Sequence, residues 1–354
     1  MVFLFHFGED RRPHGVIEKV FLKLTELGWT GVDLFFALSG FLITGILLDD
    51  RGKPHAYRDF LARRLWRIFP PYYALLLLVF VALRGLLWGS ATYRAFHAEQ
   101  LWYWLYLQNW RIAFVGWPQF LNMGHLWSLA VEEQFYLVWP TVVLLLARRT
   151  LWRVACSLVV IAPLLRVALW TLWRADAVSI LYVSTLTRMD ALAAGALVAL
   201  IVRQPGALAR LRRHASLAVW ASLGVLSGLL LWRRAFLWKD PPIAVIALTP
   251  LCVLMALAVA RVATASPDGP VVRALSLAPL RWLGKVSYTA YLIHQPILQV
   301  VRRVEGRVTA FGRFTPWLGM LLGAALTLAG AAASWHLIEK RLLRLAPRRP
   351  PLTG

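Results

Sequence analysis

The chain has 354 residues, of which 59% are hydrophobic and only 16% are charged. A soluble domain is about 45–50% apolar and about 25% charged, so this composition excludes an ordinary soluble fold. The formal net charge of +22 would suggest a nucleic-acid partner in a soluble protein. Here the basic residues lie mostly in short loops between apolar stretches, which argues for membrane lipids and against nucleic acid as the partner.

Nine apolar stretches have the length of about 20 residues that a helix needs to cross a bilayer. They cover 29–48, 68–89, 125–147, 151–173, 179–202, 215–232, 242–263, 282–301 and 316–338. We therefore predict an all-α, polytopic transmembrane bundle, with a membrane domain over 1–339 and a short basic cytoplasmic tail over 340–354. The two cysteines lie in separate spans, so neither a disulfide framework nor a cysteine metal site is expected.

The chain opens with MVFLFHF, which is apolar but too short to cross a bilayer. Because residues 31–33 open the next span from the outside, we expect Met1 to lie within a first helix whose earlier turns are missing. With that helix complete, the protein would have about ten spans. His6 lies at the outer end of this partial helix, and a single histidine at such a boundary usually has no chemical role.

The side of the membrane on which the later basic clusters lie depends on whether the segment 101–117 crosses the membrane. This segment is rich in Trp and Tyr, as interfacial segments are. If 101–117 spans, the later clusters face outside. If it lies in the interface or re-enters, all clusters face the cytoplasm, and we favour this arrangement. Arg63, Arg64 and Arg67 belong to the first cluster. They are interpreted either as a topology signal with headgroup contacts or as a clamp for phosphate groups.

The span that begins at His125 carries ionisable groups deep in an apolar sequence. His125, Glu132 and Tyr136 share one helical face, with Ser128 beside them. Glu132 and Glu133 would lie about 10–12 Å deeper than His125, where a carboxylate costs on the order of 2.5–3.5 kcal/mol and usually has a function. Glu133 points about 100° away from Glu132, so one carboxylate can face a cavity while the other anchors a helix. The alternative is that both pair with Arg or Lys between helices.

Other polar residues interrupt the neighbouring spans. Asp33 lies near the outer end of its span, and Ser39 lies at its middle beside a glycine, a pattern typical of close helix packing. Arg188 and Asp190 lie about mid-membrane at i and i+2, so they point to opposite sides and need different partners. In 282–301, the side chains of Ser287, Tyr291 and His294 share a face, and Pro296 can kink the helix beside them.

These residues together predict an inner basic site, an outer site with histidine and carboxylates, and a buried path between them. An enzyme that takes an activated donor from the cytoplasm and a hydroxyl acceptor from the outside needs this layout. A transporter or flippase of small acids or lipid-linked sugars could use it too, although such proteins usually show inverted repeats. A catalytically inactive partner protein is a third alternative.

Five segments resemble the motifs of the membrane acyltransferase 3 family, in the same order along the chain. The segments are 31–42, 63–73, 125–140, 188–192 and 287–296, and the most specific is WSLAVEEQFY at 127–136. The resemblance implies a bacterial inner-membrane O-acyltransferase. It would move an acetyl or other short acyl group from acyl-CoA to a hydroxyl of a cell-surface carbohydrate or glycosylated metabolite. Acyl-CoA would be a co-substrate, with no bound cofactor and no metal.

The resemblance also implies roles. His6 matches the catalytic histidine of the family, whereas the arginine that precedes it there would lie before Met1. Oriented by Glu132 or Glu133, His6 would deprotonate the acceptor hydroxyl or accept the acyl group itself, since its ordinary pKa of about 6.5 suits both roles. Polarisation of the thioester carbonyl is assigned to one of His125, Tyr291 and His294.

The other expected contacts follow from the same resemblance. The CoA phosphates would be bound by Arg63, Arg64 and Arg67. The remaining residues expected to contact substrate are Asp33, Ser39, Trp127, Ser128, Arg188 and Asp190. Some relatives carry an extracytoplasmic hydrolase-like domain that completes the transfer, so this chain either acts alone or hands acyl groups to a separate extracytoplasmic partner transferase.

Overall fold

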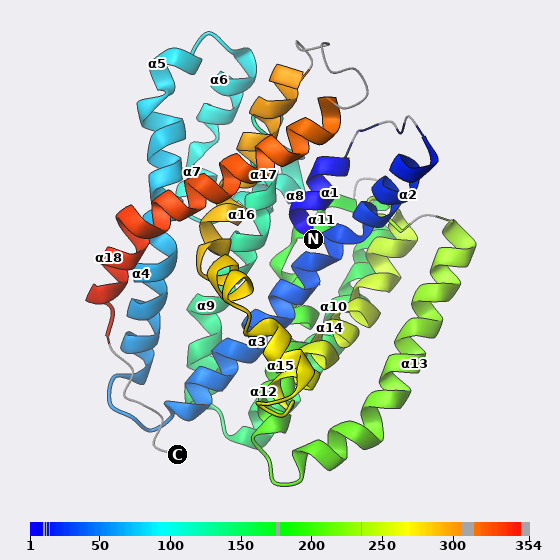
Figure 1. Ribbon diagram of the computed structural model, residues 1–354. Helices are drawn as coiled ribbons and strands as arrows, with labels where there is room; N and C mark the ends of the chain where they lie inside the picture. The colour runs from blue at the N-terminus through cyan, green and yellow to red at the C-terminus, as the bar shows by residue number, and fades with distance from the viewer. Residues whose placement is uncertain are drawn as a thin grey trace. The chain divides into compact units, whose positions relative to one another are not determined.

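The computed structural model describes residues 1–9, 11, 13, 15–174, 178–234, 236–305 and 315–347. Within these ranges the chain is helical and contains no strand, which confirms the predicted all-α class (Figure 1). Seven helical segments of the described chain are long and apolar enough to cross a membrane, so the protein is a multi-pass membrane protein. They are Val16–Asp49, Ala56–Ala82, Arg148–Trp173, Val178–Val202, Ala215–Arg233, Ile243–Ala263 and Trp317–Leu345.

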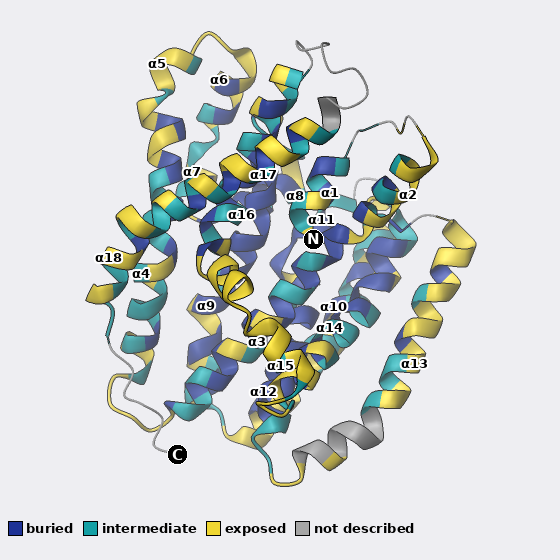
Figure 2. Ribbon diagram, in the orientation of Figure 1, coloured by how far each residue is buried: buried dark blue, intermediate teal, exposed yellow. Residues whose placement is uncertain are grey.

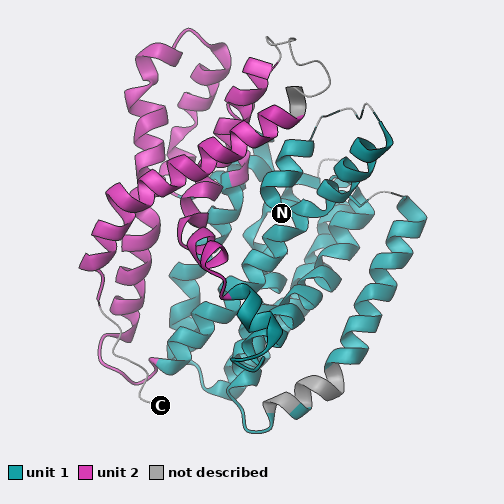
Figure 3. Ribbon diagram, viewed as in Figure 1, with its two compact units in different colours: residues 1–49, 106–117, 126–275 teal, residues 50–105, 118–125, 276–354 magenta. Residues whose placement is uncertain are grey.

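The helices group into two compact units (Figure 3). Unit 1 comprises Met1–Asp49, Tyr106–Trp117 and Leu126–Leu275, and unit 2 comprises Asp50–Leu105, Pro118–His125 and Ser276–Gly354. The elements of unit 1 are α1 (Val2–Gly8), α2 (Val16–Thr25), η1 (Glu26–Thr30), α3 (Gly31–Asp49), α8 (Gln108–Val115), α9 (Trp127–Leu145), α10 (Arg148–Trp173), α11 (Val178–Val183), α12 (Thr185–Val202), α13 (Ala207–Arg233), η5 (Ile243–Ala247), α14 (Leu248–Ala263) and α15 (Pro270–Leu275).

Unit 2 is built around two long helices, α4 and α16, with shorter elements between and after them. Its elements are α4 (Ala56–Leu77), η2 (Leu78–Ala82), α5 (Arg84–Leu87), α6 (Ala91–Ala98), α7 (Gln100–Trp104), α16 (Ala278–Glu305), α17 (Thr315–Ser334), η7 (Trp335–Glu339), α18 (Lys340–Leu342) and η8 (Leu343–Leu345). In this unit α16 packs against α17 and α4. The short turn η3 (Met123–Leu126) lies where the chain passes from unit 2 into unit 1, and it leads into α9.

The core of unit 1 is formed by α3 and α12, which are largely buried, whereas α13 is mostly exposed (Figure 2). Two glycines allow α3 and α12 to approach closely. A Cβ on Gly40 would collide with the backbone carbonyl of Leu192, and a Cβ on Gly195 would collide with that of Ala37. Small residues at such a contact are the usual way in which membrane helices pack tightly.

Several predicted boundaries are corrected by the structure. The span predicted over 68–89 begins earlier, because α4 starts at Ala56 and continues through Pro70 and Pro71. The three arginines before this span therefore lie on a helix and not in a loop. The span predicted over 179–202 is interrupted between α11 and α12, where Ser184 has an extended backbone.

The ambiguous segment 101–117 does not form one spanning helix. It contains the end of α7 and the whole of α8, which has eight residues. Between them Tyr106 has a φ of 53°, a left-handed conformation that an aromatic residue rarely adopts and that ends a helix. Eight residues are far fewer than the roughly 20 that a spanning helix needs, so the structure supports the arrangement in which this segment does not cross.

Candidate functional site

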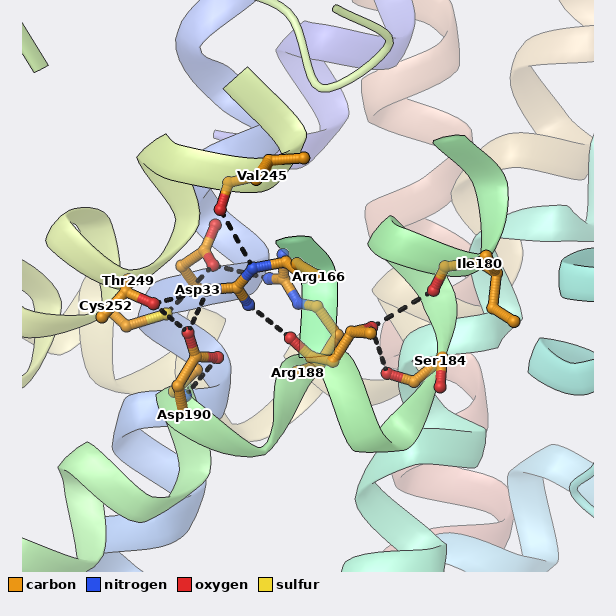
Figure 4. A network of polar contacts seen from close by, with 11 residues as sticks. Asp33, Arg166, Ile180, Ser184, Arg188, Asp190, Val245, Thr249 and Cys252 are labelled. Atoms are coloured by element: carbon orange, nitrogen blue, oxygen red, sulfur yellow. Dashed lines mark hydrogen bonds and ion pairs between the residues drawn. The ribbon is translucent and has the colours of Figure 1, made fainter. Parts of the chain in front are cut away.

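Four buried charges form two ion pairs inside unit 1 (Figure 4). Arg188 Nη2 donates to Asp33 Oδ1 at 2.5 Å, which joins α12 to α3. Arg166 Nη2 donates to Asp190 Oδ2 at 2.8 Å, which joins α10 to α12. The sequence prediction that Arg188 and Asp190 need different partners is confirmed, because their side chains leave α12 in different directions.

Both carboxylate oxygens of Asp190 accept hydrogen bonds. Thr249 Oγ1 donates to Oδ2 at 2.6 Å, and Arg166 also donates to the backbone carbonyl of Thr187 at 2.5 Å and to that of Val245 at 3.3 Å. A buried charge with this many partners is held in place as a structural element. Sequence reasoning missed Arg166, although an arginine deep within the apolar stretch 151–173 was the signal that could have found it.

The surroundings of Arg188 are aromatic. Its guanidinium carbon lies 5.2–5.8 Å from the ring centres of Tyr182, Phe36 and Trp127. Its Nε and Nη1 atoms have no hydrogen-bond acceptor among the described residues. Cation–π attraction to these rings therefore stabilises the charge of Arg188, whereas hydrogen bonds stabilise the charge of Arg166. The structure thus brings together three of the predicted contact residues: Asp33, Trp127 and Arg188.

The same two helices that hold Asp33 and Trp127, α3 and α9, meet again at a polar contact. Ser39 Oγ and Tyr136 OH both donate to Oε1 of Glu132. Glu132 is therefore the carboxylate that anchors α9 to α3, and the predicted face that joins Glu132 to Tyr136 is observed. Ser128 is buried on α9, and Glu133 is half-buried on another side of that helix.

His6 lies on α1 with its side chain 16% exposed. Its Nδ1 is 3.3 Å from Oε2 of Glu9, and the other oxygen of Glu9 is 3.4 Å from Lys239 Nζ. Burial acts to raise the pKa of Glu9, but the hydrogen bond and charge of His6, together with Lys239, outweigh it and lower that pKa. We expected Glu132 or Glu133 to orient His6, whereas the carboxylate that the structure places against its ring is Glu9. The spacing of i and i+3 in HFGE was the missed signal.

In unit 2, three predicted residues form one cluster. The ring centres of His125 and His294 are 4.9 Å apart, and Tyr291 OH donates to the backbone carbonyl of His125 at 2.9 Å. His125 is not on α9 as predicted but in the tight turn η3, because α9 begins only at Trp127. Both of its ring nitrogens lie 3.1 Å from a backbone carbonyl oxygen, those of Asn122 and Leu292. These two contacts hold the ring of His125 in place within unit 2.

The three arginines of α4 also lie in unit 2, with different surroundings. Arg63 Nη2 is 3.2 Å from Asp50 Oδ2, Arg64 lies 5.6 Å from the ring centre of Phe60, and Arg67 is exposed. Unit 1 contains a second basic group, Arg148, Arg149 and Arg153 of α10, which lines a hollow of about 520 Å³ with Trp152 and Gln204. In the described part of the chain none of these three arginines forms an ion pair.

A helical multi-pass protein with buried ion pairs and a histidine–carboxylate pair fits an integral-membrane transferase, and comparison with known proteins identifies the class. The chain belongs to the membrane acyltransferase 3 family, whose model, described as an acyltransferase domain, matches residues 1–336. This match confirms the resemblance inferred from the five sequence motifs.

The curated relatives are similar to this chain at about the same level. They include a peptidoglycan O-acetyltransferase, OatA, of Listeria monocytogenes, 29% identical over 78% of this chain and 46% of its own length. A putative peptidoglycan O-acetyltransferase, YrhL, of Bacillus subtilis is 29% identical over 88% of this chain and 50% of its own. The O-acetyltransferase OatA of Staphylococcus aureus is 29% identical over 80% and 48%. The chain thus spans about half the length of these relatives. No solved structure matches it.

Proposed function

We propose that this protein is a membrane O-acyltransferase of the bacterial cytoplasmic membrane. It moves an acetyl or other short acyl group from acyl-CoA to a hydroxyl of a cell-surface carbohydrate or glycosylated metabolite. The observation that carries the proposal is the family match over 1–336, which includes every polar residue discussed above. The names of the relatives support a glycan as the acceptor.

The contacts of His6 support its role as the base. Since Nδ1 faces Glu9, the carboxylate favours the tautomer with its proton on Nδ1 and leaves Nε2 to accept a proton. Nε2 takes the proton of the acceptor hydroxyl, whose oxygen attacks the thioester carbonyl carbon. The carbon–sulfur bond then breaks, and the CoA sulfur leaves as a thiol with the proton that Nε2 took up. The alternative course is that Nε2 accepts the acyl group first and passes it to the hydroxyl.

The donor site is proposed to be basic. Acyl-CoA carries several phosphate groups, which guanidinium groups bind well. Arg63, Arg64 and Arg67 are the proposed ligands, with Tyr291 and His294 near the thioester in the same unit. In an alternative form of the proposal, the acyl group is handed first to a separate extracytoplasmic transferase, which passes it to the carbohydrate.

The test measures transfer directly with purified protein in detergent. Radiolabelled acetyl-CoA is supplied with the N-acetylglucosamine–N-acetylmuramic acid disaccharide, and label on the sugar is counted. His6→Ala is expected to lower the rate by about 100-fold or more, the usual contribution of a general base. His336→Ala is the matched control, because His336 is exposed on η7. Retention of full activity by His6→Ala would remove the proposed base, and absence of label with the wild-type protein would count against the disaccharide as acceptor.

A further inference from the structure

A hollow of about 230 Å³ lies beside α1 in unit 1. It is bounded by the end of α1, by the start of η1 and by the segment that follows α13. The charged side chains that line it are Glu9, Arg11, Glu26 and Lys239, and an apolar part of its wall is formed by Trp238. We propose that this hollow binds a single sugar ring of the acceptor. The inference rests on the proposed function and adds where the acceptor is held.

The charges around the hollow favour a hydroxyl-rich ligand. Two carboxylates and two cations line it, so their charges balance and neither a phosphate nor a free cation is the natural ligand. Carboxylates accept hydrogen bonds from sugar hydroxyls, while the arginine and lysine side chains donate to sugar oxygens. Glu26 also accepts from Lys23 Nζ at 2.7 Å, and Arg11 Nε donates to the backbone carbonyl of Phe7 at 3.0 Å, so a sugar would share these groups with their present partners.

Trp238 supplies the apolar part of such a site. Its ring is stacked on Tyr182, with ring centres 4.4 Å apart and planes 14° apart, and its residue is only 7% exposed. The indole is therefore held rigidly, as aromatic rings that bind ligands often are. Lys239 Nζ lies 5.6 Å from the same ring centre. Because its ring is covered by these neighbours, Trp238 closes the wall of the hollow, and the charged groups around it are the ones that a sugar would contact.

Glu9 connects the hollow to His6. One oxygen of this carboxylate contacts Lys239 at 3.4 Å and the other contacts His6 Nδ1 at 3.3 Å. A ligand that binds to Glu9 or Lys239 is thereby held beside the proposed base. Glu9 acts as a positioning residue, because it orients His6 and does not itself take the hydroxyl proton.

The size and the predicted side of the hollow agree with this ligand. Small-molecule sites usually measure about 300–1,000 Å³, so a hollow of about 230 Å³ suits one ring of a glycan and not a long segment. The sequence prediction places His6 at the outer end of its helix, and Glu9, which lines the hollow, follows His6 by three residues. A cell-surface acceptor would reach the hollow without crossing the membrane.

The test uses two variants of the hollow, Lys239→Met and Glu26→Gln, in the disaccharide assay. Each is expected to raise the KM for the disaccharide about tenfold or more, the loss expected of one hydrogen bond to a charged group. The KM for acetyl-CoA should stay unchanged. Lys19→Met and Glu18→Gln are matched controls on α2, since neither residue lines the hollow. An unchanged KM for the disaccharide in both hollow variants would overturn the site.

The positioning role of Glu9 is tested separately, by the pH dependence of kcat. Glu9→Gln should shift the pH profile of kcat, because it removes the charge beside His6, and Glu9→Asp should restore part of the wild-type profile. A purely structural role would lower the amount of folded protein and leave the pH profile in place, which would overturn the positioning role.

A binding measurement separates failure of the site from failure of the proposed function. Lys239→Cys, made in a Cys156→Ser background, is labelled with a maleimide, and the disaccharide is added as a protecting ligand. Protection of Lys239→Cys but not of Lys19→Cys supports the site even if the wild-type protein transfers no acetyl group. Equal labelling with and without the disaccharide contradicts the site whatever the enzymatic result.

Discussion

Four fully buried charges of the described chain form two pairs, and the members of each pair lie on different helices. Asp33 and Arg188 are both fully buried, as are Asp190 and Arg166. A single charge in such a place would be costly, whereas a pair with good geometry recovers most of the cost. The two pairs therefore fix how α3, α10 and α12 pack against one another.

The Asp33–Arg188 pair can be tested with a double-mutant cycle. Asp33→Leu and Arg188→Leu each leave one buried charge alone and should each destabilise the fold by about 3–5 kcal/mol. The double variant removes both charges and should lose much less than the sum of the two single variants. Thermal unfolding of the purified proteins measures this. A double variant that loses the full sum would show that the two residues act independently.

The contact between Glu9 and His6 predicts a pH dependence. Because the pKa of Glu9 lies below its ordinary value of 4.5, the charged carboxylate stabilises the fold. That contribution is complete above pH 4.5 and is lost as the pH falls through the lowered pKa. Glu9→Gln should therefore have a lower melting temperature than the wild type near pH 6, and the difference should shrink at more acidic pH. A difference that is constant across this range would contradict the ion pair.

At the scale of elements, the contact between α3 and α12 decides the packing of unit 1. The contact depends on Gly40 and Gly195, each of which lies against the backbone of the other helix. A backbone atom cannot move aside as a side chain can. This interface therefore tolerates no added carbon.

Gly40→Ala should therefore destabilise the protein by about 1–3 kcal/mol, as overpacked cores do. Gly228→Ala is the matched control, because a Cβ at Gly228 on α13 meets nothing within 4 Å. That control should be neutral or slightly stabilising, since alanine favours helix over glycine. The comparison is made by melting temperature, and equal effects of the two substitutions would refute the close approach.

The arginines of α4 and those of α10 are alternative binding sites for the donor phosphates, and substitutions can distinguish them. Arg63→Ala with Arg67→Ala should raise the KM for acetyl-CoA about tenfold, the loss of one or two charge-assisted bonds. Arg149→Ala with Arg153→Ala tests the hollow on α10 in the same assay. If only the α10 pair raises this KM, the donor phosphates bind there and not at α4.

The sequence predicts the bounds of the long helices better than it predicts the contacts between their side chains. Long apolar stretches such as 151–173 and 242–263 match α10 and η5–α14 within a few residues, because length and hydropathy decide which segments can cross. The breaks at Tyr106 and Ser184 depend on single backbone conformations that no pattern signals. Arg166, the partner of Asp190, lies on another helix, so spacing along one helix finds the residue but not this partner. Glu9 differs, because it lies three residues after His6 and spacing alone could have found it.

At the scale of the whole molecule, the proposed function is that of a membrane transferase in which helix packing positions a few polar groups. Family membership gives the reaction class, and the buried pairs explain how charged residues persist in an apolar chain. His6, Glu9 and the adjacent hollow supply the acceptor side of the proposed reaction. The proposed donor site is basic, in keeping with the charge of CoA.

The most direct measurement places the donor and the acceptor on opposite sides of a sealed membrane. The protein is reconstituted in one orientation in vesicles, with labelled acetyl-CoA on the side of the basic loops and the impermeant disaccharide on the other side. The account predicts label on the disaccharide with the wild-type protein and none with His6→Ala. Label that appears only when both substrates share one side would contradict it.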